Sequence, residues 1–472
     1  MQRLIRKVAS FFSSSSSESI AVQSEPEILS RDQHEISRNQ IDKAALDVLY
    51  GLKRAGYEAY LVGGAVRDLL LGLEPKDFDV VTDAEPDEIK KVFRQRCRLI
   101  GRRFRLAHVY FGRTVIEVAT FRGAGDAQTL KTPKKQAGSS RAVDTSGRLV
   151  RDNIYGSIDE DIWRRDFTVN SLYYNIKDFS IIDYAGALDD IEQGQLRLIG
   201  DPETRYREDP VRMIRAVRFA AKLGFDIEQK TKAPIYEMGH LLRDVSHARL
   251  FEEVLKLFHS GVAIEVFEGL RHFGLFNYLF PLTHHVLSEE EQGFPRMFVI
   301  EALKSTDARV QSGKGVNPAF LFAAMLWEPM LQRREQHLAE GFTPQEALYA
   351  AANDVIEQQI TSTSIPKRLS AQVREIWSLQ YRLPRRSGAR AQRLFEHPRF
   401  RAAYDFLGIR VAAGETAEQE LFDWWTQYQE KDGIDQVAFA NDVRSDEKKP
   451  RRKRRGRNPY RKRSQQNTEE QS

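Results

Sequence analysis

Apolar and polar positions in the first third of the chain follow two different periods. Before Tyr60 the apolar residues recur three and four apart, which predicts an amphipathic helix that leads into a strand. Two more runs have the composition of strands, Asp77–Val81 and Thr114–Ala119, and a helical pattern lies between them at Pro86–Phe93. This order of elements predicts a small mixed α/β head.

The pattern changes twice further along the chain. Between Gly123 and Gly147 the sequence is polar and rich in Gly, Ser and Lys, which predicts a mobile surface loop. From Trp163 onward helical patterns dominate, and no period of about 20 to 50 residues repeats itself, so a solenoid is not expected.

We therefore expect an α+β protein in which a small mixed β-sheet head precedes a mostly α-helical neck and body. A disordered N-terminal leader and a disordered basic C-terminal tail flank these parts. The predicted boundaries are residues 1–32 for the leader, 33–180 for the head, 181–265 for the neck, 266–440 for the body and 441–472 for the tail.

Composition narrows the class of protein. No apolar run approaches the roughly 18 residues that cross a bilayer, so we expect no integral membrane association. Cys97 is the single cysteine, which excludes an intrachain disulfide and favours a reducing, cytoplasmic location. The leader has a basic start but no continuous apolar core and no small-residue cleavage site, which favours disorder. A helix lying on the membrane surface, with peripheral association, is the alternative.

The net charge of +5 is unevenly distributed along the chain. The segment Lys448–Arg463 carries 11 Lys or Arg and no acidic residue, so the rest of the chain has a net charge of 5 − 11 = −6. A dense basic tail on a slightly acidic body is typical of a protein that binds a polyanion, and a tail that only improves solubility is the alternative. The candidate RNA-binding residues are Arg451, Arg452, Lys453, Arg454 and Arg455.

Two aspartates one residue apart, Asp77 and Asp79, are the first candidate chemistry. Strand alternation places them on one face, and Phe78 and Val80 on the other. Two such carboxylates repel each other unless a cation lies between them, and Mg²⁺ takes oxygen ligands while keeping places for water and phosphates. We therefore predict a magnesium site at this pair, with a solvated strand edge as the alternative.

A Gly-Gly turn precedes these aspartates. Gly63 and Gly64 allow backbone N–H groups to approach an anion closely, and the helix expected from Ala65 adds its positive N-terminal end. Arg67 lies in the first turn, within reach of a phosphate, and Asp68 can pair with it or with backbone donors. This arrangement predicts a triphosphate cradle; a simple turn beside a surface ion pair is the alternative.

A third acidic candidate, Glu117, lies in a strand between the apolar residues Ile116 and Val118. A carboxylate buried in such a strand needs a cation or a hydrogen-bond donor. Glu117 therefore either completes the metal site or pairs with Arg113 or Arg122.

A fourth acidic candidate is Asp166. It lies four residues before Asn170, so the two would share one helix face that could hold a ribose or a base edge. Alternatively, Asp166 caps a helix that begins at Phe167.

The order of the motifs resembles that of a known family. The pattern G-G-x-V-R-D-x-L-L-G precedes D-x-D, and "RRDFTVNSL" (164–172) and "REDPVRMIRAVRFAAKLG" (207–224) follow. This combination resembles the class II nucleotidyltransferases, the family of bacterial poly(A) polymerases and tRNA CCA-adding enzymes. The segment "LIGRRFRLAHVYFG" (99–112), the helical body and the Arg-rich tail are similar to the poly(A) polymerase branch, so the resemblance spans nearly the whole chain apart from the leader.

The resemblance implies roles for the acidic residues. It assigns metal binding to Asp77 and Asp79 and an essential role to Asp166, and it places Glu117 beside the metal pair. Which of Glu117 and Asp166 is the more important third acid stays open.

The segment around Asp209 is the last candidate. Pro210 suits a first helical position and Asp209 the cap before it, which is the alternative to a role in binding. Three arginines recur every third residue beside an apolar stripe and can present guanidiniums to a base or to phosphates. The resemblance assigns nucleobase selection to Asp209 and Arg212. The candidate nucleotide-binding residues are Gly63, Gly64, Arg67, Asp68, Arg165, Asn170, Asp209, Arg212, Arg215 and Arg218.

The resemblance implies a template-independent enzyme that adds AMP from ATP to RNA 3′ ends, releases pyrophosphate, and uses two Mg²⁺ ions. Such polyadenylation promotes RNA turnover. A tRNA CCA-adding enzyme is the alternative within the family, and an RNA-binding protein without catalytic activity is the alternative of another class. We expect a monomer, and RNA-degradation or RNA-chaperone proteins are partners that the sequence leaves open.

Overall fold

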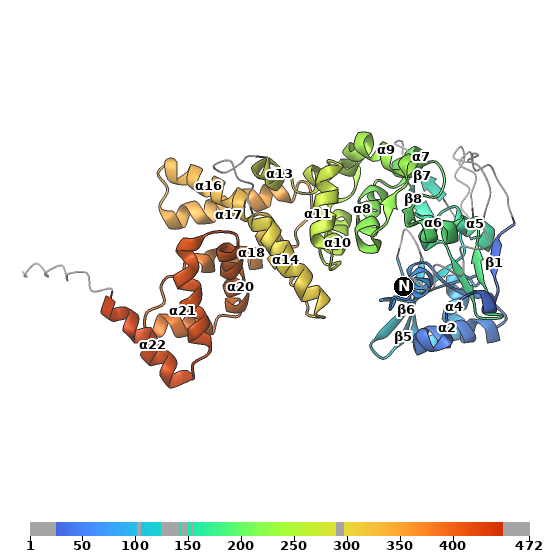
Figure 1. Cartoon of the computed structure of the whole chain (residues 1–472), viewed down its shortest axis with the longest axis horizontal. Coiled ribbons are helices and arrows are strands. Elements are labelled where there is room, and N and C mark those ends of the chain that lie inside the picture. The colour runs from blue at the N-terminus through green and yellow to red at the C-terminus, as the bar shows by residue number, and fades with distance from the viewer. Residues whose placement is uncertain are drawn as a thin grey trace, which may run out of the picture. The chain divides into compact units, whose positions relative to one another are not determined.

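The chain divides into two compact units, Met1–Leu279 (unit 1) and Phe280–Ser472 (unit 2) (Figure 1). The computed structural model describes residues 25–101, 105–123, 141–143, 149–152, 155–288 and 297–446. No helix within these ranges is both long enough and apolar enough to cross a membrane.

Unit 1 is built on an eight-stranded mixed sheet with the order β1-β10-β9-β2-β3-β6-β5-β4. Strands β3 and β6 are parallel, and the other neighbours in the sheet are antiparallel. The strands of this sheet are β1 (Glu27–Leu29), β2 (Ala59–Val62), β3 (Asp79–Thr82), β4 (Cys97–Ile100), β5 (Leu106–Phe111), β6 (Thr114–Thr120), β9 (Tyr173–Asn175) and β10 (Ile181–Asp183). Two small sheets pair β7 (Arg141–Val143) with β8 (Leu149–Asp152), and β11 (Gln195–Leu196) with β12 (Asp226–Ile227).

The two faces of the large sheet differ. Helices α2 (Lys43–Arg54) and α4 (Pro86–Phe93) cover one face, which we call the core face (Figure 1). Apolar residues three and four apart on α2, such as Val48 and Leu52, are fully buried there with Val118 of β6. The opposite face, the open face, carries a small apolar cluster near β2 and β9, and its outer strands β5 and β4 keep half-exposed or exposed side chains.

Helices make up the rest of unit 1. They are α3 (Gly64–Leu70), α5 (Ile158–Ile162), α6 (Ala187–Gln193), α7 (Pro202–Glu208), α8 (Val211–Leu223), α9 (Gln229–Met238), α10 (His247–Phe258), α11 (Ala263–His272) and α12 (Phe276–Leu279), with 3₁₀ turns η1 (Arg31–Gln33), η2 (Arg38–Gln40), η3 (Arg94–Arg96), η4 (Thr168–Asn170) and η5 (Gly239–Asp244). Helix α8 packs on α10 and α11. Gly269 permits the close approach of α11, because a Cβ there would lie 2.7 Å from Val217 Cγ1.

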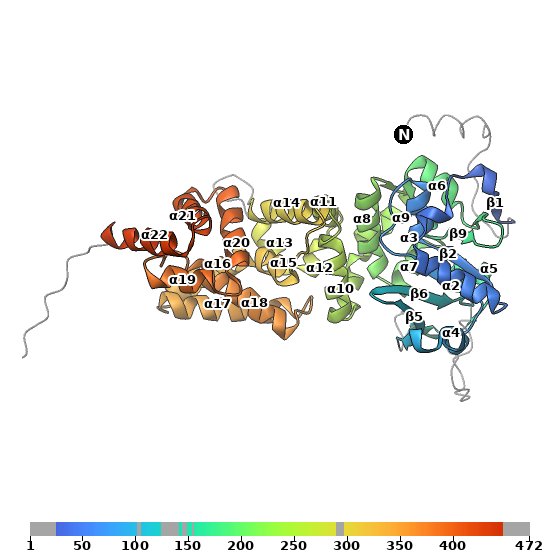
Figure 2. The ribbon, with the colours of Figure 1, turned by 90° about the horizontal axis from the view of Figure 1, so that it is seen from below.

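Unit 2 is all-helical in its described part. Its helices are α13 (Pro281–Leu287), α14 (Phe298–Gln311), α15 (Pro318–Met325), α16 (Trp327–Ala339), α17 (Pro344–Gln359), α18 (Lys367–Gln380), α19 (Ala389–Phe395), α20 (Phe400–Ala412), α21 (Gln419–Gln429) and α22 (Gly433–Asp446), with the 3₁₀ turn η6 (Thr416–Glu418). Helix α17 lies alongside α16 and α18 (Figure 2). Buried tryptophans tie helices together, since Trp377 Nε1 of α18 donates to the Ala323 carbonyl of α15 over 3.0 Å.

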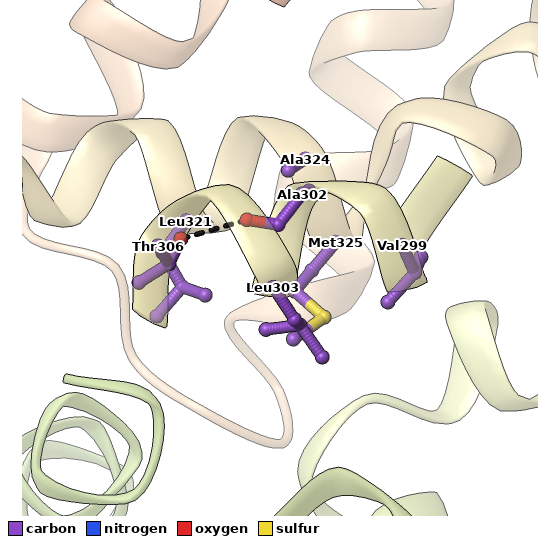
Figure 3. Close-up of a pocket in the computed structure, with 7 residues that line it drawn as sticks. All are labelled: Val299, Ala302, Leu303, Thr306, Leu321, Ala324 and Met325. Carbon is purple, nitrogen blue, oxygen red and sulfur yellow. Dashed lines mark hydrogen bonds between the residues drawn. The ribbon is translucent and has the colours of Figure 1, made fainter. Parts of the chain in front are cut away.

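A small pocket in unit 2 lies between α14 and α15 (Figure 3). Its lining residues are all buried, and its one polar side chain, Thr306, donates to the Ala302 carbonyl of the same helix over 2.8 Å. With no charged or unsatisfied group in its lining, the pocket is a packing gap between helices and not a candidate site.

The structure confirms most predicted elements and moves some boundaries. Helix α4 has the predicted bounds, and β6 extends the predicted strand by one residue, whereas β3 begins two residues later than predicted, at Asp79. The predicted disorder is wrong for the end of the leader, because Glu27–Leu29 form β1 and pair with β10. It is also wrong for the start of the tail, where α22 continues to Asp446. Most of the predicted loop 123–147 lies outside the described residues, and its residues 141–143 form β7.

Candidate active site

The two aspartates lie at the start of β3 on the open face. Asp77 and Asp79 are exposed, whereas Phe78 and Val80 pack into the core on the other side. The predicted division between the two faces is therefore confirmed, although Asp77 precedes the strand instead of belonging to it. Asp79 pairs with Val62, the last residue of β2, so it lies next to the Gly-Gly turn.

Glu117 lies beside these aspartates. The parallel register that pairs Val80 with Val118 brings Asp79 next to Glu117 on the open face. Desolvation, followed by the charges of Glu117 and Asp77, raises the pKa of Asp79 to about 6. The prediction that Glu117 is buried is wrong, because its side chain is 46% exposed and its Oε2 lies 3.5 Å from His108 Nε2.

The Gly-Gly turn connects β2 to α3. Gly63 has a φ of +74°, a conformation that side chains rarely tolerate, and it precedes the first residue of α3. A Cβ on Gly63 would lie 4.0 Å from Arg165 Nη1. The other nitrogens of Arg165 are bonded, since Nε donates to Tyr173 Oη over 3.0 Å and Nη2 to Asp161 Oδ2 over 2.9 Å. Arg165 is thus held with Nη1 towards the turn, and its charge partly offsets the raised pKa of Asp79.

Arg67 is buried and bonded within the protein, whereas an exposed position was expected. Its side chain is 2% exposed, its Nε donates to Asp68 Oδ1 over 2.8 Å, and its Nη1 donates to Asn170 Oδ1. Asp68 is also buried, and its second oxygen lies 3.8 Å from Lys222 Nζ of α8. The surface ion pair considered as the alternative is therefore a buried one, and in this structure Arg67 connects α3 to η4.

Asp166 is held at the junction of the sheet with α8. Its Oδ2 accepts two hydrogen bonds from Arg215, and its Oδ1 accepts from the Phe167 backbone over 2.9 Å and from Asn170 Nδ2 over 3.2 Å. Burial alone would raise the pKa of Asp166, but Arg215 and the other donors outweigh it and hold the pKa well below its usual range. The predicted helix from Phe167 is wrong, since only the short 3₁₀ turn Thr168–Asn170 follows.

The Asp209 segment forms the start of α8. Pro210, not Asp209, is the residue before the first helical position, and Asp209 Oδ2 accepts from Arg249 Nη2 of α10 over 2.7 Å. Arg212 is 8% exposed and donates through Nη1 to the Arg205 carbonyl over 2.7 Å and to Glu208 Oε2 over 3.2 Å.

The third arginine of this stripe, Arg218, lies over the Phe219 ring at 4.4 Å. Among the described residues its buried Nε has no hydrogen-bond partner. Burial, reinforced by the charge of Arg215, lowers its pKa to about 10. The predicted exposed basic ridge is therefore wrong for Arg212 and Arg215, which are engaged in internal contacts.

Several neighbours of the site were not predicted from the sequence. Asp161 and Tyr173 fix Arg165, Arg249 fixes Asp209, and His108 contacts Glu117. The signal available for Asp161 was its position four residues before Arg165, which is the spacing of a helical ion pair. The candidate tail residues Arg451, Arg452, Lys453, Arg454 and Arg455 lie outside the described residues.

Three family models match successive parts of the chain. The poly A polymerase head domain matches residues 59–197, the probable RNA and SrmB-binding site of polymerase A matches 224–287, and the polymerase A arginine-rich C-terminus matches 340–459. The curated poly(A) polymerase I of Salmonella typhi is 50% identical over 90% of each chain. The chain belongs to the poly(A) polymerase I family. As a member of this family it is an enzyme, a nucleotidyltransferase of the poly(A) polymerase type.

More distant similarity extends to the CCA-adding enzymes. The CCA-adding enzyme of Lactobacillus helveticus is 36% identical over 47% of this chain and 52% of its own length. Among solved structures, the Bacillus stearothermophilus CCA-adding enzyme in complex with CTP has a TM-score of 0.53 at 23% identity and covers 82% of this chain and 81% of its own. At this identity the likeness shows a shared nucleotidyltransferase fold and nothing finer.

Proposed function

We propose that this enzyme adds AMP from ATP to the 3′ ends of RNA, without a template, and releases pyrophosphate. The observation that carries the proposal is the crowding of Asp77, Asp79 and Glu117 next to the Gly63 turn and the Arg165 guanidinium. Membership of the poly(A) polymerase I family, with 50% identity across 90% of the chain, supports the choice of product.

The donor set at the carboxylates fits Mg²⁺. It consists of oxygen atoms only, and the raised pKa of Asp79 reflects repulsion from Glu117 and Asp77 in addition to desolvation, which a divalent cation would relieve. Within the described ranges no three His, Cys, Asp or Glu side chains are close enough to hold an ion alone, so Asp77 and Asp79 would share it with phosphate oxygens and water. When bound, Mg²⁺ would supply charge stabilisation at the reacting phosphate.

The chain's own residues would orient the substrates. The Gly63 turn and Arg165 Nη1 lie on the β2 side of Asp79, where they would hold the triphosphate and its departing pyrophosphate. Arg212 is fixed by internal hydrogen bonds at the start of α8 and Asp209 by Arg249 of α10, which suits one constant nucleobase preference. We expect the enzyme to be cytoplasmic and monomeric.

We expect the purified enzyme to build long tails from ATP on an unstructured RNA with a free 3′-hydroxyl, and to add CTP poorly. Each nucleoside triphosphate is supplied separately with Mg²⁺, and products are resolved by length. Addition confined to tRNA that lacks its 3′ end, stopping after C-C-A, would show a CCA-adding enzyme instead. No incorporation of radiolabelled ATP on any RNA would favour the non-catalytic RNA-binding protein.

We expect deletion of residues 448–472 to weaken RNA binding and to flatten its dependence on salt. The deletion removes the 11 basic residues, and if all contact phosphates the slope of log K against log salt falls by up to about 8. Deletion of residues 1–24 is a control of nearly equal length that removes three basic residues. An identical salt slope for the full chain and the tail deletion would show that the tail does not contact RNA.

A further inference from the structure

The open face of the sheet continues outward from the carboxylates across β6, β5 and β4. Glu117 of β6 pairs with His108 of β5, and His108 pairs with Arg98 of β4. Because paired residues point to the same side of a sheet, these three side chains form one row on the open face. Asp79 stands at the inner end of this row through the β3–β6 register.

A tyrosine completes this outer surface. The Arg98 guanidinium lies over the Tyr110 ring at 5.4 Å, and the Tyr110 and His108 rings meet edge to face at 6.4 Å. Arg98 is exposed. Within the described part of the chain, Arg98 has no acidic partner and the Tyr110 hydroxyl has no hydrogen-bond partner. We call Arg98, His108 and Tyr110 the outer shelf; it is cationic and aromatic, and it is not part of the proposed metal and triphosphate sites.

The position of the outer shelf relative to the triphosphate is set by strand order. The Gly63 turn follows β2, which borders β3 on one side, whereas the shelf lies beyond β6 on the other side. In phosphoryl transfer the attacking and leaving oxygens lie roughly in line on opposite sides of the phosphorus. With pyrophosphate leaving on the side of the Gly63 turn, the attacking 3′-hydroxyl approaches over the outer shelf.

We propose that the outer shelf binds the 3′-terminal nucleotide of the RNA primer. Single-stranded RNA is bound by stacking bases on aromatic rings or guanidinium planes and by pairing phosphates with arginine, and Arg98 on Tyr110 offers both. His108 contacts both Tyr110 and Glu117, so a nucleotide bound on the outer shelf lies next to the carboxylates. The inference rests on the proposed function, since it assigns a substrate of that reaction to a surface.

The test compares Michaelis constants for the two substrates. We expect Arg98→Ala and Tyr110→Ala each to raise KM for a short oligoadenylate primer by about tenfold, the value of one stacking or phosphate contact, while KM for ATP changes less than twofold. Arg96→Ala is the matched control and leaves both constants unchanged. Arg96 makes the same kind of contact, 5.5 Å above the Phe111 ring, but Phe111 packs towards the core face.

Photo-crosslinking of the unmodified enzyme gives a second measurement that does not depend on the folding of a variant. A primer with 4-thiouridine at its 3′ end is expected to cross-link to the peptide that contains Tyr110. The inference would be overturned by an unchanged KM for the primer in Arg98→Ala and Tyr110→Ala, or by an equal rise in KM for ATP. Cross-links found only outside β4 and β5 would overturn it as well. Failure of the unmodified enzyme to extend any RNA with ATP would instead overturn the proposed function.

Discussion

We expect Asp79→Asn to reduce AMP addition by at least about a thousandfold, more than the loss of a single well-placed hydrogen-bond donor. The substitution keeps the shape of the side chain but removes a negative charge that would hold the proposed Mg²⁺ beside the reacting phosphate. The fold is retained, because Asp79 is exposed at the start of β3 and forms no ion pair within the described part of the chain. The charges that act on it most strongly are the like charges of Glu117 and Asp77.

The measurement is single-turnover addition of AMP to RNA with saturating Mg²⁺, together with the thermal unfolding temperature. Asp79→Asn removes repulsion from two neighbouring carboxylates, so its unfolding temperature in the absence of metal is equal to or above that of the unmodified enzyme. Asp83→Asn is the matched control. Asp83 lies just after the other end of β3, and its Oδ1 accepts a hydrogen bond from the Glu58 backbone N–H over 2.8 Å. We expect its replacement to leave activity unchanged. Near-normal turnover of Asp79→Asn would refute the metal site.

Local sequence patterns predicted the parts of the site that one strand or one turn determines. Alternation along a strand separates Asp79 from Val80 whatever the rest of the chain does. The Gly63-Gly64 pair indicated the turn before α3, in which Gly63 has a φ of +74°. The bounds of α4 followed from Pro86 at its first position and from its apolar spacing.

Contacts between distant segments could not be predicted in this way. Arg67 meets Asn170 across 103 residues of sequence, and no local pattern distinguishes a buried arginine of this kind from an exposed one. The row from Glu117 to Arg98 depends on the register of three strands, which the pattern within any one strand does not specify. Strand β1 is only three residues long, and its pairing with β10 gives the segment order that its composition does not indicate.

The second large effect is expected for Asp166→Asn, which tests whether the junction between sheet and α8 positions the site. An asparagine retains one oxygen acceptor but presents an amide to Arg215, whose half-buried charge then lacks its partner. We expect a loss of about 3 kcal/mol in the free energy of unfolding, and about a hundredfold loss in kcat/KM for ATP. The second loss arises because the new amide and the Arg215 guanidinium are both donors and repel each other, which displaces the side chain that also accepts from Asn170, the partner of Arg67.

Two readouts separate a positioning role of Asp166 from general loosening of the fold. Asp190→Asn is the control: Asp190 accepts from Thr168 Oγ1 over 2.6 Å and pairs with Arg197, so its loss loosens the same turn without touching Arg215. We expect a comparable loss of stability in Asp190→Asn but nearly normal kcat/KM per folded molecule. Equal losses of activity in both variants would reduce Asp166 to a structural role.

The pH dependence of stability gives the second readout for Asp166. Because its pKa in the folded state lies below the ordinary value of about 3.9, the Asp166–Arg215 contact contributes fully above that pH and is lost as pH falls through the depressed pKa. The stability difference between the unmodified enzyme and Asp166→Asn therefore stays constant from pH 7 to about 5 and shrinks only below about pH 4. A difference that shrinks already near pH 6 would mean that the contact with Arg215 is not what stabilises the ionised carboxylate.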